Sequence, residues 1–416
     1  MNNLPENHKI CLYALRGCHI RPEGGVVPCC IAKVSNHIQP NIKNIHNERN
    51  NEWHVKLRKD LYNGIENPIC NTCWDSEKKS GSSYRTEVVQ QNPGILENIK
   101  INSDGTLADD IINFWDIRDT NKCNMKCLNC NPGYSSLFNQ EALINQHNEK
   151  YKNYIQLRPR GDTAISTSLS EEAIHTQILP SLNEHTKHLY FAGGEPLISD
   201  SHYYILKYLV DNDLAKNIKL FYNTNLLKTS HFGIDLSSLW DEFGNVVLGL
   251  SIDAIEERAE FARYGTNWKT INENILKIKN TNARINVNST QSPYTFFKLH
   301  ETINWFHSVI EYSENRSTGI FRFSIAIGSD KWSLQVIPYE LRLNYLNYIE
   351  SNFDVFNEFK FSQYNYFKKT VLVQEGWDQD RVNKARKDLK YYLDLMDSVR
   401  GTNWQTTCPE IVDILN

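Results

Sequence analysis

The sequence predicts an α/β protein with a parallel sheet. From residue 114 onward, six short apolar runs rich in β-branched and aromatic residues alternate with amphipathic stretches. This alternation favours a parallel sheet covered by helices, either a doubly wound sheet or a complete or partial barrel. The chain has 416 residues, of which 40% are hydrophobic, so it can bury a large core. The predicted strands are 114–120, 188–192, 218–223, 246–252, 285–289 and 320–326.

Amphipathic periodicity predicts helices between and after these strands. The clearest helical patterns within the alternating region are 199–210, 268–279 and 295–308. After residue 330 the pattern becomes helical and aromatic, with helices expected over 339–349 and 379–396 and a Tyr/Phe-rich run over 353–367. We therefore expect three parts: a cysteine-rich domain over 1–105, an α/β domain over 106–330 and a helical segment over 331–416.

Three cysteines follow the first predicted strand within one short loop. They are Cys123, Cys127 and Cys130. A structural zinc site closes its tetrahedron with four protein ligands, whereas three thiolates can hold three corners of a cubane iron–sulfur cluster. The fourth iron would then stay open to a small chelating ligand, so the count of three favours chemistry over a purely structural role.

Polar and glycine residues mark the ends of the next predicted strands. Because ligands of parallel α/β sheets bind at the carboxyl ends of the strands, we expect these residues to surround one site. Each also has an ordinary reading: a tight turn, a polar loop, a helix cap or a surface ion pair. The residues are Gly193, Gly194 and Glu195 after the second strand, Asn225 after the third, Ser251 and Asp253 at the fourth, and Arg263 beyond it.

A second set of cysteines lies near the amino terminus. A glycine turn over 21–26 predicts a short hairpin that delivers Cys29, and Cys70 and Cys73 form a CX2C pair. With Cys11 these make four thiolates, which fit structural zinc or a fully ligated iron–sulfur cluster. Three further cysteines leave alternatives open: Cys30 could replace Cys29, Cys18 is a ligand or a buried apolar residue, and Cys408 is expected in the core, with a hydrogen-donor role as the alternative.

Composition limits the cellular setting and the partners. No secretory signal precedes Cys11 and no apolar run reaches 18 residues, so we expect a soluble, cytoplasmic protein that does not contact a membrane. Ten cysteines in such a chain favour metal ligands and free thiols over disulfides. The formal net charge of −4 gives no overall basic field, which disfavours nucleic acid as a partner.

Residues 110–330 resemble the radical S-adenosylmethionine (AdoMet) superfamily. Its CX3CX2C loop is matched by Cys123, Cys127 and Cys130, and its GGE motif by 193–195, although the aromatic residue usual before the third cysteine is Asn129 here. The resemblance implies a partial (βα)6 TIM-like barrel whose 4Fe-4S cluster chelates AdoMet through the open iron. One electron from the cluster would cleave the sulfonium, and the resulting 5′-deoxyadenosyl radical would abstract a substrate hydrogen. It further implies Glu195 near the amino group of AdoMet, Arg263 on its carboxylate, Ser251 and Asp253 on the ribose, and Asn225 on the nucleoside side.

The amino-terminal cysteines resemble the auxiliary-cluster modules called SPASM and twitch domains. Cys11, Gly24 and Cys29 match the CX9-15GX4C spacing, although such a module normally follows the barrel and here precedes it. The resemblance implies a second, auxiliary 4Fe-4S cluster on Cys11, Cys29, Cys70 and Cys73, with zinc as the alternative. It also implies a peptide or protein substrate and an electron donor such as flavodoxin or ferredoxin. The alternatives are a nucleotide, sugar or nucleic-acid substrate, or a non-enzymatic zinc-binding or electron-transfer protein.

Overall fold

A computed structural model of the chain describes most of its residues. These are residues 8–22, 24–34, 42, 44–97, 99–109, 111–155, 165, 167–311, 319–326, 328–353, 362–373 and 376–416. The chain forms two compact units. Unit 1 comprises Met1–Lys122, Ile165–Tyr222 and Ser230–Val246, and unit 2 comprises Cys123–Ala164, Asn223–Thr229 and Val247–Asn416. The predicted boundaries at 105 and 330 stay predictions.

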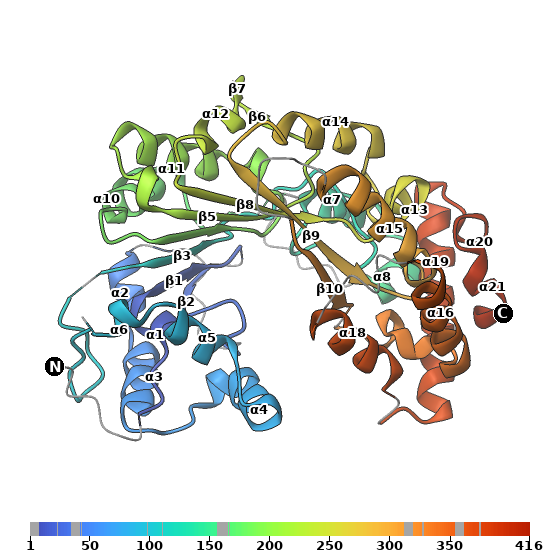
Figure 1. The fold of residues 1–416 in the computed structure, drawn as a ribbon, viewed down its shortest axis with the longest axis horizontal. Coiled ribbons are helices and arrows are strands. Elements are labelled where there is room, and N and C mark those ends of the chain that lie inside the picture. The colour runs from blue at the N-terminus through green and yellow to red at the C-terminus, as the bar shows by residue number, and fades with distance from the viewer. Residues whose placement is uncertain are drawn as a thin grey trace. The chain divides into compact units, whose positions relative to one another are not determined.

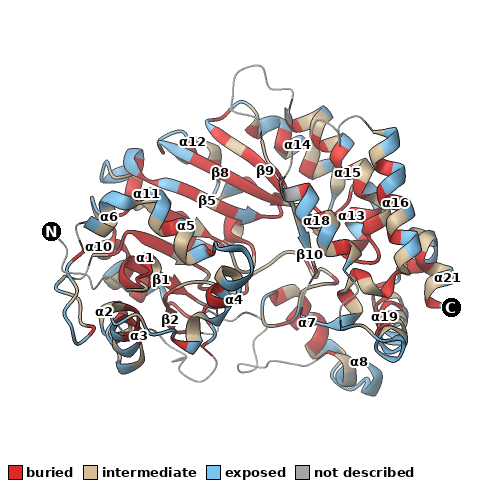
Figure 2. Ribbon diagram, turned by 60° about the horizontal axis from the view of Figure 1, so that its bottom comes forward, coloured by how far each residue is buried: buried red, intermediate tan, exposed pale blue. Residues whose placement is uncertain are grey.

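The α/β class and all six predicted strands are confirmed. They are β3 (Phe114–Ile117), β4 (His188–Phe191), β5 (Lys219–Thr224), β8 (Asn245–Ser251), β9 (Ala283–Gln291) and β10 (Phe321–Ile325). β3 with β4, β4 with β5, and β9 with β10 pair in parallel. The strand order is β10-β9-β8-β5-β4-β3-β1-β2, and within the described residues no pairing joins its two ends, so the sheet does not close into a complete barrel. β8 is buried along most of its length, as Figure 2 shows.

An amino-terminal hairpin extends the sheet. β1 (Gly17–Ile20) pairs in parallel with β3, and β2 (Val26–Val27) pairs antiparallel with β1. Gly24 and Gly25 form the turn with φ of 96° and 81°, a region that favours glycine. The hairpin predicted over 21–26 is therefore confirmed. The parallel pairing of β1 with β3 was not predicted, because a four-residue strand carries too little periodicity to reveal its neighbour.

Unit 1 has helices on both sides of its strands. Figure 1 shows α1 to α6 on one side of β1 and β3, and α10, α11 and α12 on the other side of β4 and β5. Asn51 and Ser83 cap α3 and α5 by accepting the backbone N–H of His54 and Thr86. The helices and turns are α1 (Leu12–Arg16), α2 (Ile45–Arg49), α3 (Glu52–Tyr62), η1 (Pro68–Cys70), α4 (Asn71–Ser80), α5 (Tyr84–Gln91), α6 (Pro93–Glu97), α9 (Glu171–Ala173), η2 (Ile174–Ile178), α10 (Leu179–Ser181), η3 (Pro196–Ile198), α11 (Asp200–Asp211), η4 (Ala215–Asn217) and α12 (Leu236–Trp240), with a small ribbon of β6 (Ser230–His231) and β7 (Ile234–Asp235).

Unit 2 contains the carboxyl-terminal helices. The predicted helix over 379–396 is α19 (Gln379–Arg400), which Asp378 caps at its start and Gly401 ends with a φ of 68°. Residues of α19 pack with Leu128 and Phe138 in one apolar core. Part of the Tyr/Phe-rich run over 353–367 lies outside the described residues. The other elements are α7 (Ser136–Ile144), α8 (Glu149–Tyr154), α13 (Glu256–Ala262), α14 (Trp268–Ile278), η5 (Phe296–Lys298), α15 (Leu299–Phe306), η6 (His307–Glu311), η7 (Asp330–Trp332), η8 (Leu334–Val336), α16 (Tyr339–Asn352), α18 (Ser362–Leu372), α20 (Trp404–Thr407), η9 (Pro409–Ile411) and α21 (Val412–Leu415).

No helix in the described part of the chain combines the length and the apolar character needed to cross a lipid bilayer.

A buried histidine, His202, and a half-buried one, His188, are expected to make unit 1 sensitive to acid. Burial lowers the pKa of His202 to about 3, and burial together with Lys219 lowers the pKa of His188 to about 4, from an ordinary 6.5. The unfolded chain therefore binds more protons below pH 6.5, so we expect the stability of unit 1 to fall as the pH drops from about 6.5 toward 4. Urea unfolding midpoints across this pH range measure the effect. The substitution His202→Gln should flatten the dependence, and an unchanged slope would contradict the assignment.

Candidate active site

The loop of Cys123, Cys127 and Cys130 belongs to unit 2 and is held by the start of α7. All three thiols are half-buried. The hydroxyl of Ser136 accepts the backbone N–H of Cys123 at 3.0 Å, and the hydroxyl of Ser135 donates to the Met125 carbonyl at 2.5 Å. The N–H of Cys130 donates to the carbonyl of Cys127 at 3.1 Å, which closes a tight turn between these two cysteines. The first part of the loop is thus tied to the start of α7, and its second part forms a turn of its own.

Backbone hydrogen bonds tie this loop to the segment that follows α13. The N–H of Lys126 donates to the Tyr264 carbonyl at 2.8 Å, and the N–H of Leu128 donates to the Ala262 carbonyl at 2.9 Å. Arg263 lies between the two acceptors in the chain, close enough to Cys127 for its charge to act on the thiol. Burial raises the pKa of this thiol, and the positive charge of Arg263 opposes that shift. Arg263 is therefore placed to favour the thiolate form that a metal requires.

Arg263 also forms a bidentate ion pair with Asp253. Its Nε and Nη2 lie 2.8 and 3.0 Å from the two carboxylate oxygens, and the N–H of Thr290 donates to Asp253 Oδ1 at 2.8 Å. Asp253 is buried, and Ser251 is half-buried at the end of β8. The predicted partners of these two charged groups are parts of AdoMet, whereas in the structure the two groups pair with each other. Their predicted roles toward a ligand stay predictions.

Asn225 reaches the cysteine loop from the chain that follows β5. Its Nδ2 donates to Asn124 Oδ1 at 2.7 Å, and its Oδ1 accepts the N–H of Leu227 at 3.0 Å. Gly265 packs on the same part of the loop with a φ of 105°, and a Cβ there would lie 2.9 Å from the Asn124 carbonyl oxygen. Unit 2 thus gathers the three cysteines, Asn225, Asp253 and Arg263 around one loop.

The GGE motif lies in unit 1, after β4. The N–H of Gly194 donates to the Thr120 carbonyl at 3.2 Å, and the N–H of Glu195 donates to the Lys122 carbonyl at 2.7 Å. The Glu195 carboxylate is 2% exposed and accepts the N–H of Leu197 at 3.1 Å, which caps η3. The motif therefore packs on residues 120–122, which directly precede Cys123 in the chain. The predicted role of Glu195 toward an amino group stays a prediction.

Replacing Gly194 by alanine should disturb this packing. A Cβ at Gly194 would lie 2.2 Å from the Lys122 carbonyl oxygen, and backbone atoms cannot move aside cheaply. We expect Gly194→Ala to destabilise unit 1 by about 1–3 kcal/mol. Calorimetric melting of this variant beside Gly94→Ala, whose Cβ would meet no atom within 4 Å, provides the comparison. Equal melting temperatures for the two variants would show that the close approach is unimportant.

The amino-terminal cysteines approach one another in unit 1. Burial raises the pKa of Cys11 to about 11 and that of Cys70 to about 12, with neighbouring thiols adding to both shifts. These neighbours are Cys73 for Cys11, and Cys11 and Cys73 for Cys70. Cys29 faces the same group, because Cys11 and Cys70 add to the rise of its pKa that burial causes.

Two of the spare cysteines lie in different surroundings. After burial, the main influences on the pKa of Cys30 are Arg118 and Asp116, and those on Cys18 are Arg49 and Asp116. The surroundings of Cys29 and Cys30 therefore differ. Which of the two is a ligand was left open by the sequence, and the ligand set stays a prediction.

The donor atoms in both places fit iron or zinc. Thiolates are soft ligands that suit iron–sulfur clusters and zinc, and each set supplies sulfur alone. Among the described residues, no three His, Cys, Asp or Glu side chains are arranged as a ready-made metal site. All ten cysteines are free thiols. Metal binding would therefore require the loss of thiol protons and small movements of these side chains.

A buried charge cluster next to the cysteine loop was not anticipated from the sequence. Glu141 accepts from Arg400 Nη2 at 3.0 Å, from Tyr151 Oη at 3.0 Å and from Lys126 Nζ at 2.5 Å. Tyr392 of α19 also donates to the Leu128 carbonyl at 3.0 Å. Arg400 lies 259 positions from Glu141, so no local pattern could have revealed the pair.

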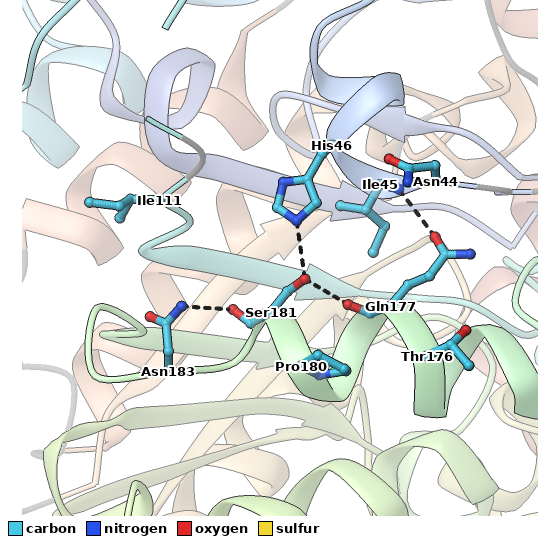
Figure 3. Close-up of a pocket in the computed structure, with 9 residues that line it drawn as sticks. All are labelled: Asn44, Ile45, His46, Ile111, Thr176, Gln177, Pro180, Ser181 and Asn183. Atoms are coloured by element: carbon cyan, nitrogen blue, oxygen red, sulfur yellow. Dashed lines mark hydrogen bonds between the residues drawn. The ribbon is translucent and has the colours of Figure 1, made fainter. Parts of the chain in front are cut away.

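Unit 1 also has a polar pocket of about 410 Å³ near α2 and α10 (Figure 3). His46 Nε2 lies 3.4 Å from Ser181 Oγ, but the Ser181 hydroxyl donates its proton to the Gln177 carbonyl at 2.6 Å. The histidine is therefore not placed to take that proton. This pocket does not have the geometry of a serine nucleophile with its base.

Comparisons with known proteins give likenesses to solved structures alone. No family model matches the sequence, and no curated protein matches it. A structure of histidine-tagged anSMEcpe with bound AdoMet is 17% identical, with 58% of each chain covered and a TM-score of 0.35. Streptococcus suis SuiB bound to its precursor peptide SuiA is 12% identical, with 75% of this chain and 71% of that chain covered and a TM-score of 0.37. SuiB bound to S-adenosylmethionine is 11% identical, with 73% and 62% covered and a TM-score of 0.34.

The chain spans 58–61% of the length of the first three structures it matches. TM-scores this low leave the function to be argued from the residues of this chain.

Proposed function

We propose that the protein is a radical AdoMet enzyme whose 4Fe-4S cluster is held by Cys123, Cys127 and Cys130. The observation that carries the proposal is the three-thiol loop, whose backbone pairs with the residues on either side of Arg263 and whose Cys127 thiol lies near the Arg263 charge. A loop that offers three sulfur ligands leaves one iron of a cubane for a small chelating molecule. When bound, such a cluster supplies one electron to the sulfonium of AdoMet.

The residues around the loop would bind and orient AdoMet. Arg263 is within reach of an anionic group at the loop, and exchange of its Asp253 partner for the AdoMet carboxylate would keep the guanidinium paired. Asp253, once released, would accept hydrogen bonds from the ribose hydroxyls together with Ser251. We assign Asn225 to the nucleoside side, and the backbone and carboxylate of 193–195 to the amino group.

We further propose an auxiliary 4Fe-4S cluster on Cys11, Cys29, Cys70 and Cys73, and a peptide or protein as the substrate. The mutual approach of the four thiols supports the first part. The substrate class rests on the likeness of this cysteine set to auxiliary-cluster modules of peptide-modifying enzymes. Ten free cysteines suit a reducing compartment such as the cytoplasm, where a reduced flavodoxin or ferredoxin would deliver electrons.

Anaerobic reconstitution with iron and sulfide tests the proposal. We expect about eight irons and matching sulfide per chain, and 5′-deoxyadenosine from AdoMet after dithionite is added. Bound zinc with little iron would contradict the enzyme assignment. A full iron complement without any 5′-deoxyadenosine, in the presence and absence of candidate peptides, would instead indicate an electron-transfer protein.

The auxiliary site gives a separate prediction for two adjacent cysteines. Cys29 faces Cys11 and Cys70, whereas Cys30 faces Arg118 and Asp116. We expect Cys29→Ala to lower the bound iron by about four per chain, and Cys30→Ala to leave it unchanged. Iron analysis and Mössbauer spectra of the reconstituted variants measure this. Equal losses in both variants would show that the site is not built around Cys29.

A further inference from the structure

A pocket with a volume of about 670 Å³ opens at the amino-terminal ends of the parallel strands of unit 1. Arg16 directly precedes β1 and Asn113 directly precedes β3, while His188 and Lys219 are the first residues of β4 and β5. The GGE motif follows the opposite, carboxyl end of β4. The pocket and the GGE motif therefore lie at opposite ends of β4.

The strand register shows which side chains near this pocket project from the same face of the sheet. Phe114, His188 and Lys219 are direct register partners across β3, β4 and β5, so their side chains project from the same face of the sheet. The rings of Phe114 and His188 stack with 5.0 Å between their centroids. Burial and the nearby Lys219 charge keep the pKa of His188 at about 4, so its imidazole is neutral at pH 7.

The pocket carries positive charge without a carboxylate among its described lining residues. Lys187 donates to the Glu184 carbonyl at 2.9 Å, and neither Lys187 nor Lys219 has an ion-pair partner in the described part of the chain. Arg16, in contrast, is paired with Asp109, whose Oδ2 accepts from its Nη2 at 3.0 Å. Lys187 and Lys219 both line this concave surface, and two positive charges there raise its electrostatic potential. Among the described lining residues, Lys187 and Lys219 are therefore the positively charged ones without an ion-pair partner.

Most of the exposed surface of this pocket is apolar. Pro93 and Ile95 of α6, together with Ile111, contribute to it, although polar residues also line the pocket: Gln91, Asn92, Asn113, His185 and Asn217. Its volume falls within the range of ligand sites for small molecules, which is about 300–1,000 Å³. The apolar lining favours a ligand with an apolar body, and the two lysines favour a double negative charge. A phosphate monoester has both features, because its phosphate carries about two negative charges near pH 7.

We propose that this pocket binds a phosphate monoester with an apolar body, with Lys187 and Lys219 on the phosphate. The inference is independent of the proposed function, because binding would require neither an iron–sulfur cluster nor AdoMet.

Calorimetric titration of the full chain with phenyl phosphate tests this inference. At pH 7.5 and low salt we expect saturable binding that weakens as sodium chloride is added. The double variant Lys187→Ala/Lys219→Ala should weaken it at least tenfold. Lys216→Ala removes an exposed lysine of η4 outside the pocket and should leave binding unchanged. Benzoate, which has a similar body and a single charge, should bind at least fivefold more weakly than phenyl phosphate.

Several outcomes would overturn the inference. These are no binding of phenyl phosphate by the unmodified chain, equal binding by the double variant, or an equal loss in Lys216→Ala. Benzoate that binds as tightly as phenyl phosphate would show that the ligand class is wrong. If the double variant does not fold, the NMR signals of the His188 imidazole in the unmodified chain decide, because phenyl phosphate should shift them and an unchanged spectrum would contradict the site.

Discussion

Cys127→Ala is expected to lower 5′-deoxyadenosine formation by the reconstituted protein more than a hundredfold while the chain stays folded. The reason is that a cubane with two remaining cysteine ligands is not held in place for electron transfer to AdoMet. The Cys127 thiol is half-buried in a loop whose backbone is fixed by hydrogen bonds to Tyr264 and Ala262, so truncation of one side chain should leave the loop in place. Product formation is measured by chromatography, and folding by circular dichroism.

Cys408→Ala is the matched control for this experiment. Cys408 lies outside both cysteine sets, in the core of unit 2, where its thiol donates to the Tyr294 carbonyl at 3.7 Å. Its loss should leave cluster content and AdoMet cleavage within about twofold of the parent, at a small cost in stability. If Cys127→Ala cleaved AdoMet as fast as the Cys408 variant, the three-thiol loop would not be the cluster site.

Glu141→Gln is expected to destabilise unit 2 by about 3–5 kcal/mol, because it removes the anion from a buried cluster with two cations. The side chains of Glu141 and Arg400 are 3% and 1% exposed. Burial opposes ionisation of Glu141, but hydrogen bonds and charges from Arg400 and Lys126 outweigh it, so the pKa of this carboxyl lies below its usual value. Urea unfolding followed by tryptophan fluorescence measures the loss, since Trp332 and Trp404 lie in the same core.

The Glu350 pair provides the comparison for this prediction. Glu350 lies 2.8 Å from Lys368, and both side chains are about 30% exposed. Exposed pairs of this kind contribute about 0–1 kcal/mol, so Glu350→Gln should have little effect. If the two variants lost equal stability, the buried cluster would not hold the carboxyl-terminal helix to the cysteine loop.

The pairing of Glu141 with Arg400 and Lys126 also predicts a pH dependence. Unit 2 should lose stability as the pH falls through the lowered pKa of Glu141.

Much of the fold could be predicted because short-range patterns of apolar and polar residues indicate the strands and helices. The six strands after residue 114 are runs of apolar residues, and their observed limits lie within three residues of the predicted ones. The helices α11, α14 and α19 likewise follow from amphipathic spacing, although α19 continues four residues beyond the predicted end at 396. By contrast, β1 is four residues long, and its parallel pairing with β3 depends on the packing of the amino-terminal segment.

The candidate site was predictable in its residue types and less so in their contacts. Spacing alone grouped Cys123, Cys127 and Cys130, because three thiols within eight residues must lie near one another. It could not reveal that Arg263 pairs with Asp253, or that Cys29 rather than Cys30 faces Cys11. These side-chain contacts depend on the conformation of loops, which the spacing of residues in the sequence does not indicate.

The order of strands and helices, the two cysteine sets and the polar residues at the strand ends can all be predicted from the amino-acid sequence. The contacts between distant side chains depend on the folded chain. Folding joined Arg400 to Glu141 across 259 positions and brought Lys126 to the same carboxylate. It also placed Lys187 and Lys219, which have no carboxylate partner among the described residues, in the lining of a pocket at the amino ends of the strands. The physical reason is that periodicity and spacing act over a few residues, whereas pairing of distant charges is set by how the apolar core packs.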